Sequence, residues 1–400
     1  MKINRVAVLG NKDHGKSTLI GNLMISTGST SQQRITDAKE ASARFGQRFE
    51  PAFILDSFME ERKGGFTLDS TRVQMVHGGR AFEFIDLPGH EELMKNMLSG
   101  ASNAESALVL ISADPKEGIS EQTMRHVFLA SMLGMGSLTF AVNKMDAAGY
   151  SQQAFEEIKA RMSSFISGIG FSGRSAFVPI SAYASENLIG LSRNMPWYSG
   201  QSLMQTLAYG SRSQVRNRKD PLRLSIQGTL DGDLIIGKML SGSLRQGQSV
   251  VSMPQSVKGK VSKLYVGNKP AKSAIAGQNV AIRTDMKANP PIPGSVVYGA
   301  KSAPSFGDSF SAMVFATSRL GNDVEMRVNG TSVPCRMQVG HYLYPLNVRP
   351  RSGGVKPLCA ARVTITPSRP IVAEPFRKSR ELGRFSIYYH DRFAGIGIML

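Results

Sequence analysis

The sequence predicts a multidomain fold of the α/β plus all-β class: a mostly parallel sheet flanked by helices, followed by two β-barrels. The first half of the 400-residue chain alternates short apolar runs with helical patterns, as βαβ units do. The second half carries strand-like runs separated by turns that contain Gly, Asp or Pro, which is typical of all-β barrels. A polar, charged stretch between the halves lacks apolar periodicity and indicates a linker.

The predicted elements follow in chain order. The strands expected in the first half cover residues 5–9, 81–85, 106–111, 138–142 and 176–180. Those expected in the first barrel include residues 222–226, 234–236, 249–252 and 280–283, and a second all-β series begins at Ser309. The expected domains are therefore an α/β domain at 1–210, a basic linker at 211–220, one barrel at 221–302 and another at 303–400.

The composition is that of a globular protein, with 41% hydrophobic and 20% charged residues, so disorder is not expected to be the main state. No run approaches the roughly 18 apolar residues that span a bilayer, so neither a membrane segment nor export is expected. Cys335 and Cys359 are too few for a disulfide framework or a four-cysteine zinc site. These features favour the reducing cytoplasm.

The net charge of +18 is concentrated in the second half of the chain. Residues 1–210 hold 20 Lys and Arg against 20 Asp and Glu, whereas the remaining residues hold 28 against 10. So basic a half suggests a polyanionic partner, such as RNA, DNA or an anionic membrane surface, although the charge could also serve solubility alone. The basic residues singled out are Arg212, Arg216, Arg218, Lys219, Lys258, Lys260, Lys263, Arg377, Lys378, Arg380 and Arg384.

A phosphate-binding loop is predicted at residues 10–17, where GNKDHGKS follows the first strand and precedes a helical pattern. In such a loop, backbone N–H groups and the helix N-terminus surround the phosphates. Lys16 would add positive charge, and the Ser17 hydroxyl would ligate Mg²⁺. The predicted phosphate-binding residues are Asp13, His14, Gly15, Lys16, Ser17, Thr18 and Gly89.

A second motif, DLPGH at 86–90, follows the next predicted strand. Asp86 at that strand end could hold Mg²⁺ through water, and Gly89 could offer its N–H group to a γ-phosphate. The motif is weak alone but gains weight from its position after the phosphate-binding loop.

A guanine pocket is predicted from NKMD at 143–146, again at a strand end. The Asp146 carboxylate can accept the two N–H bonds that guanine offers and adenine lacks. The predicted guanine-binding residues are Asn143, Lys144, Asp146, Ser181 and Ala182. The expected ligand is GTP or GDP with Mg²⁺.

Together these residues resemble the translational GTPases of the elongation factor 1-alpha and elongation factor Tu family. Further marks of the resemblance are ERKGGFTLD at 61–69, NMPWYSG at 194–200 and LGRFSIYYHDRFAGIGIML at 382–400. The resemblance implies a P-loop GTPase domain followed by two β-barrels. It also implies that Thr67 ligates Mg²⁺ and that His90 positions the attacking water, with Lys16 as the second catalytic residue.

The resemblance implies a GTP-hydrolysing translation factor that delivers aminoacyl-tRNA to the ribosome, which stimulates hydrolysis. Its expected partners are the ribosome, aminoacyl-tRNA or another RNA cargo, and a nucleotide exchange factor, with no membrane contact. A cytoplasmic monomer is expected. Gly64 stands where the family commonly has arginine, so the segment around Thr67 should be more flexible than usual.

Alternative functions also follow from the resemblance. The GTPase subunit of an ATP sulfurylase is similar over all three domains, although a stable protein partner does not require so basic a second half. A paralogue could deliver another tRNA-like cargo. A ribosome-bound regulator would keep the guanine pocket without hydrolysing GTP, but the presence of His90 and Thr67 argues against it.

Overall fold

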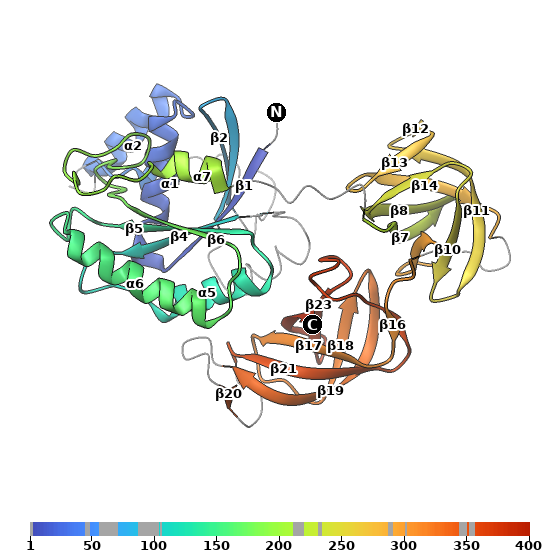
Figure 1. Cartoon of the computed structure of the whole chain (residues 1–400). Coiled ribbons are helices and arrows are strands. Elements are labelled where there is room, and N and C mark those ends of the chain that lie inside the picture. The colour runs from blue at the N-terminus through green and yellow to red at the C-terminus, as the bar shows by residue number, and fades with distance from the viewer. Residues whose placement is uncertain are drawn as a thin grey trace. The chain divides into compact units, whose positions relative to one another are not determined.

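The computed structural model divides into two compact units, residues 1–213 and 214–400 (Figure 1). The structure describes residues 3–44, 49–55, 71–86, 104, 106–210, 220–230, 234–286, 291–300, 302–343, 350–351 and 357–400. Most of the predicted linker, residues 211–219, lies outside these ranges.

The first unit is built on a six-stranded sheet in the order β2-β3-β1-β4-β5-β6. Its strands are β1 (Ile3–Gly10), β2 (Thr71–His77), β3 (Arg80–Asp86), β4 (Ser106–Ser112), β5 (Ser137–Asn143) and β6 (Arg174–Pro179). All neighbouring pairs are parallel except β2 and β3. The five predicted strands are confirmed. Strand β2 was not predicted. Its Val73 and Met75 are buried while Gln74 and Val76 are exposed, as expected for an edge strand.

Helices cover both faces of this sheet (Figure 1). The helices are α1 (Lys16–Ser26), α2 (Gln32–Arg44), α5 (Glu121–Met132), α6 (Gln152–Gly168) and α7 (Leu203–Gly210), with a 3₁₀ turn, η1 (Lys12–His14). One face packs against α1, α2 and α7 through a cluster that includes Leu19, Leu23, Phe84 and Met204. Every residue of β4 and β5 is buried, and burial on both faces explains why their sequences are mostly apolar rather than alternating.

The strand order places a ligand edge at the carboxyl end of β1. The chain runs from β1 to its neighbour β3 on one side, and then to β4 on the other side. In open parallel sheets, ligands bind where the strand order reverses in this way. The loops after β1, β4, β5 and β6 therefore meet at one edge.

The second unit contains two seven-stranded sheets. The first sheet has the order β10-β15-β7-β8-β14-β11-β12, and an additional β10–β11 pairing closes it into a barrel. Its strands are β7 (Arg223–Leu230), β8 (Leu234–Ser241), β10 (Ser249–Met253), β11 (Val257–Val266), β12 (Lys269–Pro270), β14 (Asn279–Thr284) and β15 (Val296–Gly299), with a separate ribbon of β9 (Ser243–Arg245) and β13 (Ser273–Ile275).

The second sheet of this unit has the order β18-β23-β24-β17-β21-β19-β20 and closes through an additional β18–β19 pairing. Its strands are β17 (Phe310–Ala316), β18 (Asp323–Val328), β19 (Thr331–Leu343), β20 (Pro350–Arg351), β21 (Ala360–Pro367), β23 (Arg384–Tyr389) and β24 (Arg392–Met399), with a ribbon of β16 (Phe306–Gly307) and β22 (Ile371–Val372). Each barrel encloses its own apolar cluster. The predicted class, α/β followed by β-barrels, is confirmed.

A buried ion pair joins the two barrels. Arg223 on β7 and Glu374, which follows β22, are 5% and 4% exposed, and their Nη2 and Oε1 atoms lie 2.8 Å apart. The remaining donors of the guanidinium reach the carbonyls of Leu222 and Ser302, at 2.9 and 2.7 Å. An apolar cluster at the same junction contains Leu240, Val296, Val372 and Leu382. Buried charge at the junction is therefore both paired and hydrogen-bonded, as its desolvation requires.

Across the described ranges, no helix has the length and apolar character needed to cross a bilayer.

Candidate functional site

The loop at residues 10–17 connects β1 to α1 through a single 3₁₀ turn. The Asn11 side chain caps that turn by accepting a 2.9 Å bond from the Lys12 N–H group. Gly15 then takes a left-handed conformation, with φ of 85°, and α1 begins at the next residue. A Cβ atom at Gly15 would lie 2.6 Å from the Asn143 amide nitrogen. Glycine is therefore required both by the backbone angle and by the close approach of Asn143.

The N-terminus of α1 is free to receive an anion. No side chain caps it, because its N-cap residue is Gly15. The first N–H groups of a helix lack intrahelical partners and carry partial positive charge. Lys16 lies beside them, and its Nζ donates to the carbonyls of Gly10 and Asn11, at 3.2 and 2.9 Å. The loop thus presents backbone donors and an ammonium group of the kind that bind phosphate.

Burial lowers the pKa of Lys16, whereas the nearby carboxylates of Asp86 and Asp13 act in the opposite direction. Asp86 belongs to the second motif and lies seventy residues after Lys16 in the sequence. The fold brings them together because β1 and β3 are parallel neighbours in which Val8 pairs with Asp86.

Two predicted phosphate-binding residues use their side chains elsewhere. His14 is 1% exposed, and its Nδ1 lies 3.1 Å from the Leu110 carbonyl on β4. Burial lowers its pKa, so the imidazole is neutral at pH 7 and Nδ1 donates. The Thr18 hydroxyl donates to Glu50 Oε1 at 2.8 Å. Any contact of these two residues with phosphate would therefore come from their backbone.

Asn143 links the phosphate-binding loop to the predicted base pocket. Its Nδ2 donates to the His14 carbonyl at 2.9 Å, and its Oδ1 accepts from the Ala182 N–H group at 2.8 Å. Asn143 and Ala182 are 2% and 1% exposed. The Asp146 side chain is exposed three residues later. The loops after β1, β5 and β6 are thus held together by one buried amide.

Asn22 was not among the predicted site residues, but it holds the predicted base loop after β6 from a third element. Asn22 lies on α1 and is 5% exposed, and its Nδ2 donates to the carbonyls of Ala182 and Tyr183, the latter at 3.2 Å. The available signal was an asparagine among the apolar residues of a predicted helix.

Glu117 was also absent from the predicted site residues. Its carboxylate pairs with Lys144 of the NKMD motif, at 2.6 Å between Nζ and Oε1.

The residues predicted to ligate Mg²⁺ fit that ion where the structure describes them. The Ser17 hydroxyl is half-buried in the first turn of α1, and Asp86 ends β3 beside the same loop. Hydroxyl and carboxylate oxygens are the hard donors that Mg²⁺ prefers. Thr67, Gly89 and His90 lie outside the described residues.

Comparison with known proteins agrees with this geometry. The family model described as the elongation factor Tu GTP binding domain matches residues 1–211. Elongation factor 1-alpha of Methanocorpusculum labreanum is 34% identical over 99% of this chain and 96% of its own length. The elongation factors 1-alpha of Ignicoccus hospitalis and Hyperthermus butylicus are 33% and 32% identical, over 98% and 99% of this chain and 94% and 95% of their own lengths.

Among solved structures, sup35 complexed with GDP is 20% identical with a TM-score of 0.43, covering 100% of this chain and 94% of that one. The family match covers the whole first unit apart from its last two residues, and the relatives extend it through both barrels. The chain therefore belongs to the elongation factor 1-alpha and elongation factor Tu family of GTP-binding translation factors.

Proposed function

We propose that this protein binds GTP and Mg²⁺ at the edge of the sheet where the parallel strands β1, β3, β5 and β6 end, and hydrolyses GTP in response to the ribosome. The observation that carries the proposal is the buried Asn143 amide, which joins the phosphate-binding loop to the base loop. That link sets the spacing between a phosphate site and a base site, which a nucleotide must match.

In this proposal, backbone N–H groups of residues 13–18 and the Lys16 ammonium bind the phosphates. The Asp146 carboxylate accepts the N–H groups of guanine, and the 181–182 backbone closes the pocket. Ser17, Thr67 and, through water, Asp86 would hold Mg²⁺, which would supply positive charge beside the phosphates. Gly89 contacts the γ-phosphate and His90 orients the attacking water, so the protein supplies positioning rather than covalent chemistry.

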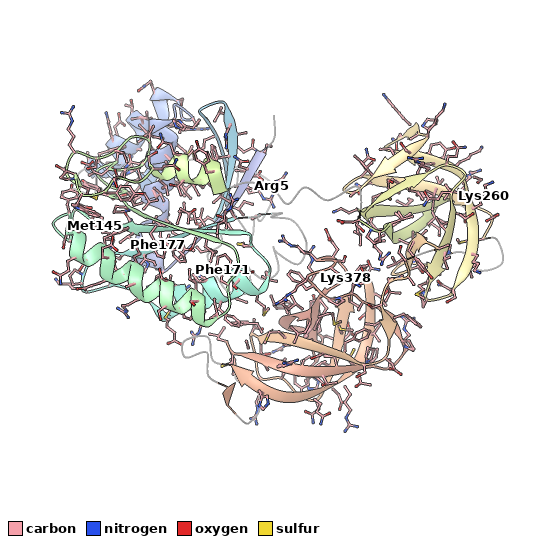
Figure 2. The ribbon with its side chains drawn as sticks, viewed as in Figure 1. Arg5, Met145, Phe171, Phe177, Lys260 and Lys378 are labelled. Carbon is pink, nitrogen blue, oxygen red and sulfur yellow. The ribbon has the colours of Figure 1, made fainter. Side chains whose placement is uncertain are left out.

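We further propose that the two barrels carry aminoacyl-tRNA. In this proposal they are the domains 221–302 and 303–400, which follow the GTPase domain 1–210 and the linker 211–220 in the sequence. Lys258, Lys260 and Lys263 support this because all three are exposed on β11, where a register shift between Val261 and Lys263 keeps the last of them outward. Figure 2 shows Lys260 on one barrel and Lys378 on the other. Sequence-independent phosphate contacts suit a carrier of many RNAs. The protein would work as a cytoplasmic monomer, with an exchange factor as a further partner.

GTP hydrolysis by the purified protein, measured alone and with ribosomes at low and moderate salt, tests the proposal. We expect slow hydrolysis that ribosomes accelerate, together with GTP-dependent binding of aminoacyl-tRNA. His90→Ala should bind GTP normally but lose the ribosome-stimulated rate. Asp146→Asn should shift preference from guanine towards xanthine, because it exchanges an acceptor for a donor. Absence of both ribosome stimulation and tRNA binding would favour a GTPase subunit of an ATP sulfurylase instead.

A further inference from the structure

Glu117 lies at the ligand edge of the sheet but belongs to none of the nucleotide motifs. It stands in the loop between β4 and α5, and β4 lies between β1 and β5 in the sheet. Its two carboxylate oxygens accept from the Lys144 ammonium at 2.6 and 2.8 Å. The contact spans 27 residues of sequence and connects a loop of no assigned role to the predicted guanine loop.

The loop that carries Glu117 is well ordered by its own hydrogen bonds. Asp114 Oδ1 accepts from the Lys116 N–H group at 2.9 Å, and the Asp114 carbonyl accepts from the N–H groups of Glu117 and Gly118, each at 3.0 Å. The Asp114 N–H group donates to Ser112 Oγ at the end of β4. An Asx turn of this kind holds its backbone without help from a ligand. Glu117 is therefore presented from a preformed turn.

The other partner is anchored at its backbone. Lys144 takes a left-handed conformation with φ of 61°, and its carbonyl accepts from the N–H groups of Ala147 and Ala148 at 3.0 and 3.2 Å. A lysine has four rotatable side-chain bonds, so a fixed backbone alone does not fix its ammonium. Glu117 fixes the far end. Hydrogen bonding from Lys144 and Ser112 also holds the pKa of Glu117 below its usual range, which keeps the carboxylate charged at neutral pH.

We propose that Glu117 is a positioning residue for the guanine site. Glu117 holds the stem of Lys144 as one wall of the base pocket and thereby slows nucleotide release. The proposal rests on the proposed function, since it assumes that the loop at 143–146 binds guanine. A lysine stem is apolar along its length and packs against flat apolar surfaces while its ammonium stays polar. Held at both ends, Lys144 would contact the face of the base without first being ordered by it.

Positioning and simple electrostatics predict opposite effects of removing this carboxylate. A negative charge near the site repels the nucleotide's phosphates, so its neutralisation alone would slow GDP release. Loss of positioning instead leaves Lys144 mobile, and ordering it then costs binding free energy. Because Lys144 would contact the face of the base rather than its edge, the effect should be the same for guanine and hypoxanthine nucleotides.

The test is the dissociation rate of fluorescent GDP and IDP from the full-length protein, measured for wild type and Glu117→Gln. We expect Glu117→Gln to release both nucleotides about fivefold faster, equivalent to about 1 kcal/mol, the upper range for a partly exposed ion pair. Glu117→Asp, which keeps the charge on a shorter stem, should give an intermediate rate. In a Lys144→Met background, Glu117→Gln should cause no further acceleration.

Glu156→Gln is the matched control, because it breaks an exposed pair with Lys159 on α6, at 3.0 Å, and should leave release unchanged. Release from Glu117→Gln that is unchanged or slower than wild type would overturn the proposal, as would equal acceleration in the Lys144→Met background. These results differ from a failure of the proposed function, in which wild-type protein would not bind GDP at all.

Discussion

The buried ion pair between Arg223 and Glu374 should stabilise the junction of the two barrels, and its contribution can be predicted from its contacts. Replacing Arg223 with Met keeps an unbranched apolar stem but removes the guanidinium. Glu374, at 4% exposure, would then be a buried carboxylate without its counterion. The carbonyls of Leu222 and Ser302 would lose their Nη1 donor as well.

The expected cost follows from these contacts. Removing one partner of a buried ion pair typically costs about 3–5 kcal/mol, because the remaining charge stays desolvated. We expect Arg223→Met to fall in that range. The double substitution Arg223→Met with Glu374→Leu leaves no uncompensated charge and should be more stable than Arg223→Met alone, because both variants leave the same two carbonyls without their Nη1 donor.

Native-state hydrogen exchange, detected by mass spectrometry, measures the free energy of local opening in the full-length chain. The free energy of opening should fall in the peptides that contain β7 and residues 371–376. Arg327→Met is the control, since it breaks an exposed pair with Glu325 on β18 and should leave those peptides unchanged.

A decrease in the free energy of opening of less than about 1 kcal/mol in Arg223→Met would refute this explanation. So small a cost is typical of exposed ion pairs and not of a buried carboxylate that has lost its counterion. It would be refuted equally if the double variant were no more stable than the single one. In that case, the buried carboxylate would not be the source of the loss.

Gly15→Ala should weaken binding of fluorescent GDP at least tenfold in an equilibrium titration, because a Cβ at φ of 85° meets the Asn143 amide at 2.6 Å; near-normal affinity would contradict the described loop. Asn22→Ala should weaken GDP binding about tenfold, because the buried Ala182 carbonyl would lose its donor, at a cost of about 1–3 kcal/mol. Unchanged affinity would show that the loop containing Ala182 keeps its conformation without Asn22. Burial raises the pKa of Cys335 to about 12, so its thiol stays protonated at pH 8. Iodoacetamide should therefore modify it slowly until urea unfolds the protein, and rapid labelling of the native chain would argue against its burial.

The sequence predicted the parts of this protein that depend on local pattern. Apolar runs of the length of a strand recur with helical patterns between them, which is enough to predict β1, β3, β4, β5 and β6. The loop chemistry was equally local. Gly15, Lys16 and Ser17 are neighbours, so their combined role can be inferred without knowing what surrounds them.

The edge strand β2 shows where such inference stops. Its alternation of buried and exposed residues is short, and residues 71–77 carry charged and polar side chains that obscure it. Antiparallel pairing with β3 over seven residue pairs, rather than the apolar content of the segment, stabilises it.

The family, the nucleotide motifs and the order of an α/β unit before two barrels could be predicted from the amino-acid sequence, because each depends on residue types at short spacing along the chain. The contacts of Asn143 with two loops, of Asn22 with the Tyr183 carbonyl, of Glu117 with Lys144, and of Arg223 with Glu374 across 151 residues are visible only in the folded chain. They could not be predicted because a polar side chain has several possible partners. Which of them it finds depends on strand order and burial, and these are properties of the whole fold.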